Sequence, residues 1–429
     1  MNDYKFIVLS ADALVTEDLK LLETMPNYSK YIMGGSGTKS MLSVCPSVTY
    51  VAHTAMASGC MPGKTGVVSN FATLEHGVKN RPWCLTHDFV KVPDIFTAAK
   101  RAGKTTAAVF WPVTGNHPDI DMLINEIPGC TPDMPIDEAL KDQGSNEEML
   151  EIARMYAGEM VRTGVHPGCD YFVADCAAEI IRRHAPDLIL VHPANVDGTR
   201  HCYGVFNEQV NTAVKETDDM LGILARAAEA SGYKDKYNII LVSDHGQMDM
   251  NRIVNVDVLF AENGWVNKET GEAEVYSVSQ GFSFYVFLKD KNDEVLKAKV
   301  EKVLKDASED GIFGFGEVLT AEQAKERYGL YGDFSFVVDT DGETGFGEEI
   351  TRPALVRFRD PTDYRKGSGC HGHFPERGPQ PVFMAKGPAF KENVICDAGH
   401  IADLAPTVAK AMDIEFYPCD GKALTDIIK

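Results

Sequence analysis

Apolar runs alternate with stretches of helical spacing along the first 250 residues of the chain. The apolar runs are short and continuous, as is typical of parallel strands covered on both faces; they lie at residues 6–10, 106–110, 188–191 and 238–243. The stretches with helical spacing lie at about residues 92–100, 170–183 and 207–230. This order predicts an α/β fold with a mostly parallel sheet, so ligands are expected at the carboxyl ends of the strands.

The pattern changes after residue 250 and predicts a second, smaller unit. Strands are expected at residues 281–288 and 334–339, and helices at about 292–305 and 321–328. The core pattern resumes with a strand at 381–385 and a last long helix at 401–411. We therefore predict a catalytic core of residues 1–250 and 364–429 with an inserted α+β cap subdomain of residues 251–363. Residues 113–165, rich in Pro, Gly and acidic residues, are expected to form a lid-like excursion.

Composition narrows the class of partner. The 429 residues are 44% hydrophobic and 24% charged, which is typical of a globular protein. The formal net charge of -21 argues against a nucleic acid polymer or an anionic membrane surface as partner. No stretch approaches the roughly 18 apolar residues of a membrane span. An anionic substrate would need bound divalent cations to reverse the local field. The oligomeric state cannot be predicted from these properties.

The cysteines and the first residues predict a cytoplasmic protein. The ten cysteines are scattered without a CxxC pair, so we expect free thiols in a reducing compartment. The first apolar run is short and is followed at once by Asp12. That pattern indicates a buried strand and not a secretory signal.

The segment at residues 43–70, SVCPSVTYVAHTAMASGCMPGKTGVVSN, places a hydroxyl near the start of a helix. β-Branched residues lead to Pro46, and an Ala/Met-rich stretch with helical spacing follows Thr49. Unpaired N–H groups and the helix dipole favour an anion such as a phosphoryl group there. On this segment alone, Thr49 is either a nucleophile or an N-cap.

Four clusters of acids and imidazoles are expected on one edge of the sheet. Three of them follow predicted strands, and the fourth lies in a Gly-rich loop. Three carboxylates and three imidazoles form the mixed oxygen and nitrogen set that suits zinc or a similar divalent metal. With a nucleophile oxygen they suffice for two metals. The residues are Asp12, Asp197, His201, Asp244, His245 and His371.

These motifs occur in an order that resembles a known family. CPSVTYVAHTAMASG is similar to its nucleophile segment and GVVSN to its phosphate-binding segment. DGTRHCYG, SDHG and CHGHFPE are similar to its metal-binding motifs, and FWP to a further signature. The chain thus resembles the type I phosphodiesterase/nucleotide pyrophosphatase family of the alkaline phosphatase superfamily, and the resemblance covers most of its length.

The resemblance implies a three-layer alkaline-phosphatase-like core and a two-metal site. Thr49 would be the nucleophile, and Asn70 would bind the phosphoryl group. Two zinc ions, or manganese, would be bound. The first would be held by Asp197, His201 and His371, and the second by Asp12, Asp244, His245 and the Thr49 oxygen. His373 competes with His371, which we choose because it directly precedes a glycine.

The resemblance also implies an activity: hydrolysis of phosphodiester or pyrophosphate bonds of small nucleotide-like substrates through a phosphorylated Thr49. Phospholipid-like diesters are also open as substrates. Two metals can stabilise the attacking and leaving oxygens of an in-line displacement. Candidate residues of the substrate pocket are Tyr50, Phe71, Trp111 and His192.

Departures from the family pattern leave the substrate open. His192 stands where nucleotide-cleaving members usually have tyrosine, and Asn195-Val196 replaces an acidic pair. Lys64-Thr65-Gly66 stands where the family usually has His-Gly. A phosphonoacetate-hydrolase-like enzyme or a phosphomonoesterase of the same superfamily is the alternative. A non-catalytic protein that binds metal or phosphate is a more remote alternative, because Thr49 and all six ligands are present.

Overall fold

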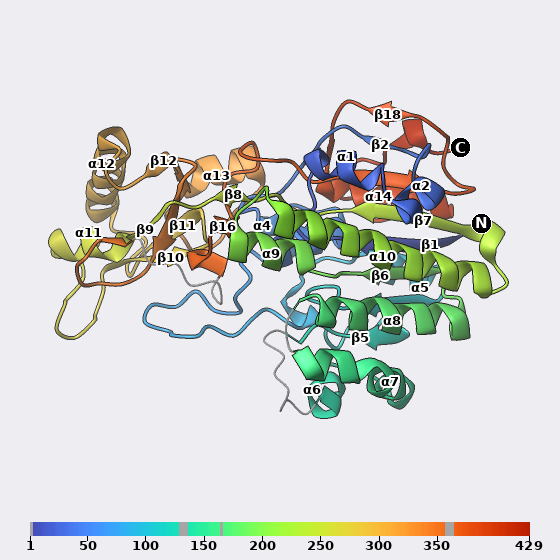
Figure 1. Ribbon diagram of the computed structural model, residues 1–429. Coiled ribbons are helices and arrows are strands. Elements are labelled where there is room, and N and C mark those ends of the chain that lie inside the picture. Colours follow the sequence, from blue (N-terminus) through green and yellow to red (C-terminus); the bar gives the residue numbers. More distant parts are fainter. Residues whose placement is uncertain (1–2, 128–135, 164–165, 357–363) are drawn as a thin grey trace.

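The computed structural model describes residues 3–127, 136–163, 166–356 and 364–429. An eight-stranded sheet lies at its centre (Figure 1). From one edge to the other, the strands are β18 (Ile395–Cys396), β2 (Ser36–Thr38), β17 (Phe383–Lys386), β7 (Tyr237–Val242), β1 (Lys5–Ser10), β6 (Leu188–Val191), β4 (Thr106–Val109) and β5 (Met122–Ile124).

The sheet is mostly parallel. β1 pairs in parallel with β6 and β7, and β4 pairs in parallel with β5 and β6. β17 is antiparallel to both of its neighbours, β2 and β7. All six residues of β1 are buried, as expected for a strand covered on both faces. The predicted mostly parallel α/β sheet is therefore confirmed.

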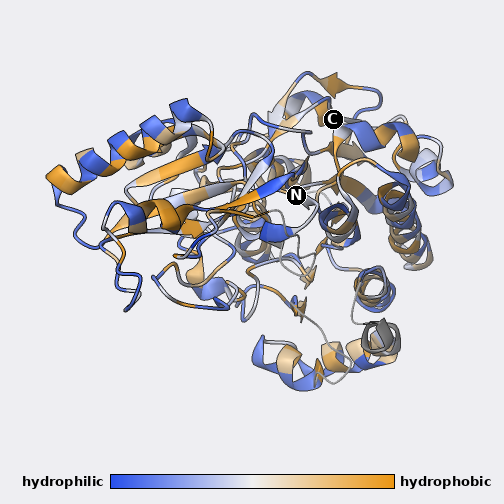
Figure 2. Ribbon diagram, turned by 60° about the vertical axis from the view of Figure 1, so that its left-hand side comes forward, coloured by the Kyte–Doolittle hydropathy of each residue, from blue (hydrophilic) through white to orange (hydrophobic). Residues whose placement is uncertain are grey.

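Helices cover both faces of the sheet and give three layers. Phe6 and Val8 of β1 belong to one hydrophobic core, with α3 (Thr49–Ser58), α5 (Ile95–Arg101) and α14 (Leu404–Met412). Ile7 and Leu9 belong to the opposite core, with α8 (Gly168–His184) and α10 (Glu208–Ala230). In Figure 2 the helices alternate between hydrophilic and hydrophobic colour, as expected when one side of each helix packs on a sheet.

Residues 113–165 form more regular structure than the sequence suggests. β5 extends the sheet, α7 (Glu147–Thr163) lies beside α8, and α6 (Ile136–Asp142) lies beside α7 (Figure 1). In α7 a short stripe of apolar residues, Met149, Leu150, Ile152 and Ala153, is buried in the core. Tyr156 and Ala157 continue this stripe with helical spacing, so the expectation of weak periodicity in this segment was wrong for α7. Residues 128–135 and 164–165 of the predicted excursion lie outside the described residues.

The predicted cap subdomain has its own antiparallel sheet. Its strands are β10 (Val275–Ser279), β11 (Ser283–Leu288), β13 (Phe336–Thr340) and β12 (Phe315–Thr320), in this order. Its helices are α11 (Val256–Glu262), α12 (Glu294–Asp310) and α13 (Ala321–Tyr328). The unit lies at one end of the central sheet (Figure 1), where the Phe282 N–H donates to the His371 carbonyl over 2.9 Å. The exact boundaries at 251 and 363 stay predictions.

Short elements complete the described chain. Three small sheets pair β14 (Thr344–Gly347) and β15 (Leu355–Val356) with β9 (Arg252–Asn255), β16 (Gly369–Cys370) with β8 (Met248–Asp249), and β19 (Gly399–His400) with β3 (Met41–Leu42). The remaining α-helices are α1 (Leu19–Leu22), α2 (Pro26–Tyr31), α4 (Pro62–Thr65) and α9 (Asn195–Tyr203). Within the described ranges, none of the helices combines the length and the apolar character needed to cross a membrane.

A buried arginine fixes α9 against the loop that follows β1. Both carboxylate oxygens of Asp18 accept from Arg200 Nη2, over 2.9 and 2.8 Å, and the Ala13 carbonyl accepts from Nη1 over 2.6 Å. The Arg200 side chain is fully buried. Removal of one partner from such a pair leaves an uncompensated buried charge.

We therefore expect Arg200→Ala to lower the free energy of unfolding by about 3–5 kcal/mol, measured by urea denaturation. Arg154→Ala is the control, because Arg154 is 46% exposed in its ion pair with Asp137. Its loss should cost less than about 1 kcal/mol. Equal losses in the two variants would contradict the role given to Arg200.

Candidate active site

The predicted metal-binding residues meet at the carboxyl ends of three adjacent strands. Asp12 follows β1, and Asp244 and His245 follow β7. Asp197 lies in α9, which follows β6. The β16–β8 pairing brings the loop that contains His371 beside the loop after β7. Parallel topology thus gathers residues that are far apart in the sequence.

Thr49 is the first residue of α3, and its hydroxyl faces this group. Val48 is extended and occupies the N-cap position, so Thr49 does not cap the helix. Thr49 Oγ1 lies 3.2 Å from His245 Nε2. The Tyr50 N–H donates to Asn70 Oδ1 over 2.9 Å, which holds the Asn70 amide beside the same helix N-terminus.

Asp12, Asp244 and His245 form the first cluster of possible metal ligands. One ligand atom from each lies within 4.8 Å of the others. His245 Nε2 is 3.2 Å from Asp244 Oδ2 and 3.5 Å from Asp12 Oδ1. All three residues are buried. The cluster therefore offers two carboxylates and one imidazole beside the Thr49 hydroxyl.

Asp197, His201 and His371 form the second cluster. Asp197 Oδ2 is 3.3 Å from His201 Nε2, and Oδ1 is 3.8 Å from His371 Nε2. Nδ1 of His201 lies 2.8 Å from the Gly369 carbonyl, and Nδ1 of His371 lies 3.1 Å from that of Ser47. A backbone carbonyl at one ring nitrogen is the usual arrangement of a metal-ligating histidine.

His245 connects the two clusters. Its ring stacks on that of His371 with centroids 4.0 Å apart, and it can join Asp197 and His371 in a three-ligand group. His373, the alternative to His371, instead places Nδ1 2.9 Å from its neighbour's carbonyl, on Phe374. Among the described residues, His373 belongs to none of the possible metal-binding groups, and His201 enters none either, although its Nε2 lies 3.3 Å from Asp197 Oδ2.

Burial and interactions with neighbouring charges shift the pKa values of the three carboxyl groups. Burial first, and then the charges of Asp244 and Asp197, raise the pKa of Asp12 well above its usual range. Burial raises the pKa of Asp244 to about 6. Burial also opposes ionisation of Asp197, but the nearby imidazoles of His201 and His371 hold the pKa of this carboxyl below its usual range.

The pKa values of the His245 and His371 imidazoles are shifted in the direction that favours metal binding. Burial lowers the pKa of His245 to about 3. Burial, and then the neighbouring His245, lower the pKa of His371 well below its usual range. Both rings are thus neutral near pH 7, which is the form that binds a metal.

Two buried oxygens support the metal assignment directly. Asp12 Oδ1 and Asp244 Oδ2 are inaccessible to solvent, and none of the described residues donates a hydrogen bond to them. Buried carboxylate oxygens without donors are costly unless a cation is bound. The oxygen and nitrogen donors suit zinc or a similar divalent ion. Two groups are compact enough to hold one, Asp12 with Asp244 and His245, and Asp197 with His245 and His371; His201 lies beside the second group.

Two of the predicted pocket residues belong to an aromatic group beside Asn70. The rings of Tyr50 and Phe71 lie 5.1 and 5.8 Å from that of Trp83. Trp111 is fully buried and packs edge-on against His53, with centroids 4.8 Å apart. This placement gives Trp111 a packing role in the described structure.

His192 contacts Asp12, one of the possible metal ligands. Its side chain is buried, with Nε2 3.0 Å from Asp12 Oδ2 and Nδ1 3.2 Å from the Phe110 carbonyl. Phe110 has φ 57°, a conformation that is unusual for a bulky residue. The geometry suits a role in orienting Asp12, and the prediction that His192 lines the substrate pocket stays a prediction.

Sequence reasoning missed three side chains of this region. Gln247 Nε2 donates to Asp197 Oδ1 over 2.5 Å, and burial raises the pKa of the Glu126 carboxyl to about 7. Trp83 is brought to Phe71 by an isolated β-bridge. Of these, only Gln247 had a signal in the sequence, because it lies two positions after His245.

Residues 6–342 match the type I phosphodiesterase / nucleotide pyrophosphatase family. The chain belongs to this family. The match covers most of the described core and much of the cap subdomain, so the resemblance seen in the motifs is confirmed.

Individual relatives of this family member are distant. Venom phosphodiesterase of Naja atra is 21% identical over 414 residues, which are 90% of this chain and 41% of the relative. Human ectonucleotide pyrophosphatase/phosphodiesterase family member 1 is 24% identical over 236 residues, which are 52% of this chain and 21% of the relative. The chain thus spans about two fifths or less of the length of these relatives.

Solved structures confirm the fold of this phosphodiesterase-family chain. Murine ectonucleotide pyrophosphatase/phosphodiesterase 5, in an inactive form with AMP bound, superimposes with a TM-score of 0.69 at 16% identity. The match covers 99% of this chain and 100% of that chain. The structure of human ectonucleotide pyrophosphatase/phosphodiesterase 5 superimposes with a TM-score of 0.70 at 18% identity. The three-layer core is therefore alkaline-phosphatase-like, as predicted.

The contact between His192 and Asp12 predicts an effect on metal affinity. His192→Leu removes the contact to Asp12 Oδ2, so we expect zinc affinity to fall about 10–100-fold in competition with a fluorescent chelator. His192→Gln can still donate to Asp12 and should lose less. The control is His184→Leu, because His184 pairs with Glu148 away from the site. Unchanged affinity in His192→Leu would rule out this role.

Proposed function

We propose that this protein is a two-metal phosphohydrolase that cleaves phosphodiester or pyrophosphate bonds of small nucleotide-like substrates through a phosphorylated Thr49. One observation carries the proposal: the Thr49 hydroxyl, at the N-terminus of a buried helix, lies 3.2 Å from His245, within the group of possible metal ligands. Family membership is consistent with this chemistry.

Each of the two clusters would bind one metal ion. Asp197, His201 and His371 would hold one metal, and Asp12, Asp244, His245 and the Thr49 oxygen the other. Two divalent ions, zinc or manganese, would supply Lewis acidity and neutralise the charge of the phosphoryl group. The same ions would reverse the local field of a chain whose net charge is -21.

Thr49 needs activation that His245 does not supply as a base. An imidazole whose pKa is about 3 binds a proton too weakly for general-base catalysis near neutral pH. Its role is therefore to bind metal and to hold the Thr49 oxygen in place. The Thr49 hydroxyl gives up its proton and its oxygen bonds to phosphorus while the bond to the leaving group breaks, so the proton ends on the departing oxygen. Water then cleaves the bond between phosphorus and the Thr49 oxygen and restores the hydroxyl.

Residues around the helix N-terminus would bind the phosphoryl group. Asn70 is held there by its bond to the Tyr50 N–H, and the dipole of α3 favours a negative charge at the same place. Preorganised donors of this kind stabilise developing charge in the transition state. Phe71 and Trp83, which are only partly buried, would form an apolar wall beside that group, suited to a planar base, and the fully buried Tyr50 would pack behind Trp83.

The names of the relatives support a diester or pyrophosphate substrate. Matched relatives include venom phosphodiesterases and a nucleotide pyrophosphatase/phosphodiesterase, and one related structure was solved with AMP.

We also propose a reducing, cytoplasmic location, because all nine cysteines in the described ranges are free thiols.

Thr49→Ala should lower turnover by at least about a thousandfold, because no nucleophile replaces the hydroxyl. Zinc content should stay near that of the wild type, since six other ligands remain, and can be measured by mass spectrometry. Thr54→Ala in the same helix is the matched control: its hydroxyl donates to the Tyr50 carbonyl over 2.7 Å. Turnover in Thr49→Ala within about tenfold of wild type would rule out the nucleophile assignment.

Initial rates with zinc present separate the candidate substrates. The panel is bis-p-nitrophenyl phosphate, p-nitrophenyl phosphate, a nucleotide p-nitrophenyl ester and phosphonoacetate. We expect the diesters to be cleaved faster than the monoester, and the nucleotide ester fastest because its base can stack on the aromatic wall. Monoester or phosphonoacetate rates above the diester rates would reject the proposed specificity in favour of the corresponding alternative.

A further inference from the structure

Three different ligand atoms converge at the start of α8, outside the active site. His166 Nδ1 lies 2.6 Å from Asp170 Oδ2 and 3.4 Å from Cys169 Sγ. Cys169 Sγ lies 3.5 Å from the same Asp170 oxygen. A nitrogen, a sulfur and an oxygen thus form a compact triangle, built from one short segment of sequence, His166-Pro-Gly-Cys169-Asp170.

This arrangement does not suit a catalytic triad. In a nucleophile–histidine–acid triad, the nucleophile and the acid use opposite nitrogens of the imidazole ring. Here Cys169 and Asp170 both face Nδ1 of His166. A thiol, a carboxylate and an imidazole nitrogen that point to one place are instead the donors of a metal site.

The surroundings hold two of the three donors in place. A Cβ at Gly198 would lie 2.4 Å from His166 Cδ2, so the imidazole packs directly on the backbone of α9. Asp170 Oδ1 accepts from the Ala194 N–H over 2.7 Å, which leaves Oδ2 turned toward the cluster. Such supporting contacts are typical of metal ligands.

We propose that His166, Cys169 and Asp170 bind a third divalent metal ion, of the zinc class. Cysteine, histidine and aspartate together favour zinc over magnesium or calcium, which prefer oxygen donors alone. The His166 side chain is 37% exposed, so an ion can enter from solvent, and water can complete the coordination. Binding displaces protons from the thiol and from the imidazole nitrogen. The proposal is independent of the phosphohydrolase chemistry.

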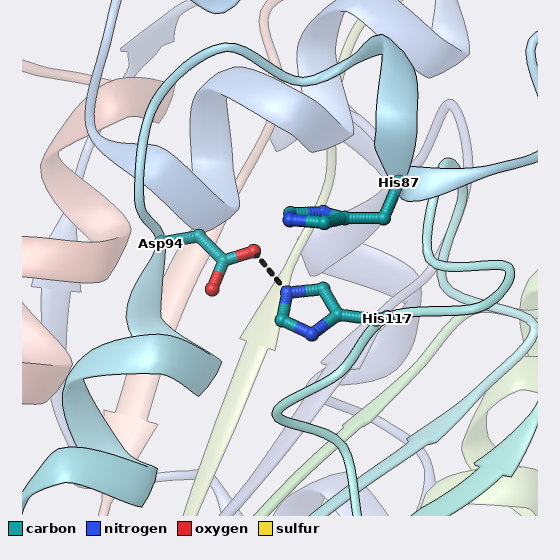
Figure 3. Close-up of side chains that lie close together, drawn as sticks. All are labelled: His87, Asp94 and His117. Carbon is teal, nitrogen blue, oxygen red and sulfur yellow. Dashed lines mark hydrogen bonds and ion pairs between the residues drawn. The ribbon is translucent and has the colours of Figure 1, made fainter.

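A second cluster of similar composition lacks the required free nitrogen. His87, Asp94 and His117 lie together, with the two rings 3.8 Å apart (Figure 3). His117 Nδ1 accepts from the Asp119 N–H over 3.0 Å, so the proton of the neutral ring is on Nε2, which donates to Asp94 Oδ2 over 2.9 Å. A metal bound at Nε2 would force the proton of the neutral ring onto Nδ1, where it would face the Asp119 N–H. We therefore expect this cluster to bind no metal, and it serves as a negative control for the proposed site.

Cobalt(II) tests the site directly, because a cobalt–thiolate bond gives a charge-transfer band in the near ultraviolet. The two active-site clusters contain only oxygen and nitrogen donors, so the band reports a cysteine ligand. The chain of 429 residues is stripped with chelator and titrated with cobalt(II) chloride. We expect the band in the wild type and its loss in Cys169→Ser, with affinity lowered about tenfold or more in His166→Ala. Zinc bound per chain should fall by one in Cys169→Ser.

Two matched variants complete the test. Cys202→Ser removes an exposed thiol of α9, and His87→Gln alters the cluster of Figure 3; both should keep the band. Zinc should also slow alkylation of Cys169 about tenfold, without slowing that of Cys202. Absence of the band in the wild type, or its persistence in Cys169→Ser, would show that the three side chains form only an ion pair with a packed thiol.

Discussion

The burial of Asp12 and Asp244 beside one imidazole is the constraint on which the site depends. Burial and the repulsion between these carboxylates raise the pKa of Asp12, and one oxygen of each receives no hydrogen bond from the described residues. Ionised carboxylates in such surroundings are stable only with a compensating cation. The neutral rings of His245 and His371 do not supply one. Divalent metals therefore satisfy the electrostatics of the site as well as its proposed chemistry.

Parallel topology explains why this costly arrangement can form. The carboxyl ends of β7, β1 and β6 lie side by side, so a short loop after each strand places its acid at the same edge of the sheet. Thr49 arrives from a different direction, at the start of a helix whose residues are all buried. A rigid helix and rigid strands hold the hydroxyl and the ligands in a fixed geometry, which covalent catalysis requires.

The sequence predicted the parts of the fold that have local signals. The strand at 188–191 and the helix at 321–328 match the structure exactly, because continuous apolar runs and caps mark them. Helix α7 was not predicted although its apolar residues recur with helical spacing, because the Pro, Gly and acidic residues of the surrounding segment favoured an irregular excursion. Motifs singled out the seven residues that stay predicted as metal ligands and nucleophile, but the contact of His192 with Asp12 and the position of Trp83 depend on tertiary packing.

Helix α9 links the active site to the proposed third metal site. It carries Asp197 and His201, and Arg200 between them is held by the buried Asp18. At its N-terminus, Asp170 accepts from the Ala194 N–H, and the His166 ring packs on the backbone at Gly198. A metal on His166 and Asp170 would fix one end of a helix whose middle is fixed by Arg200. A small rotation of α9 would move Asp197 and His201 together, so a second support on this nine-residue helix would help to place both predicted metal ligands.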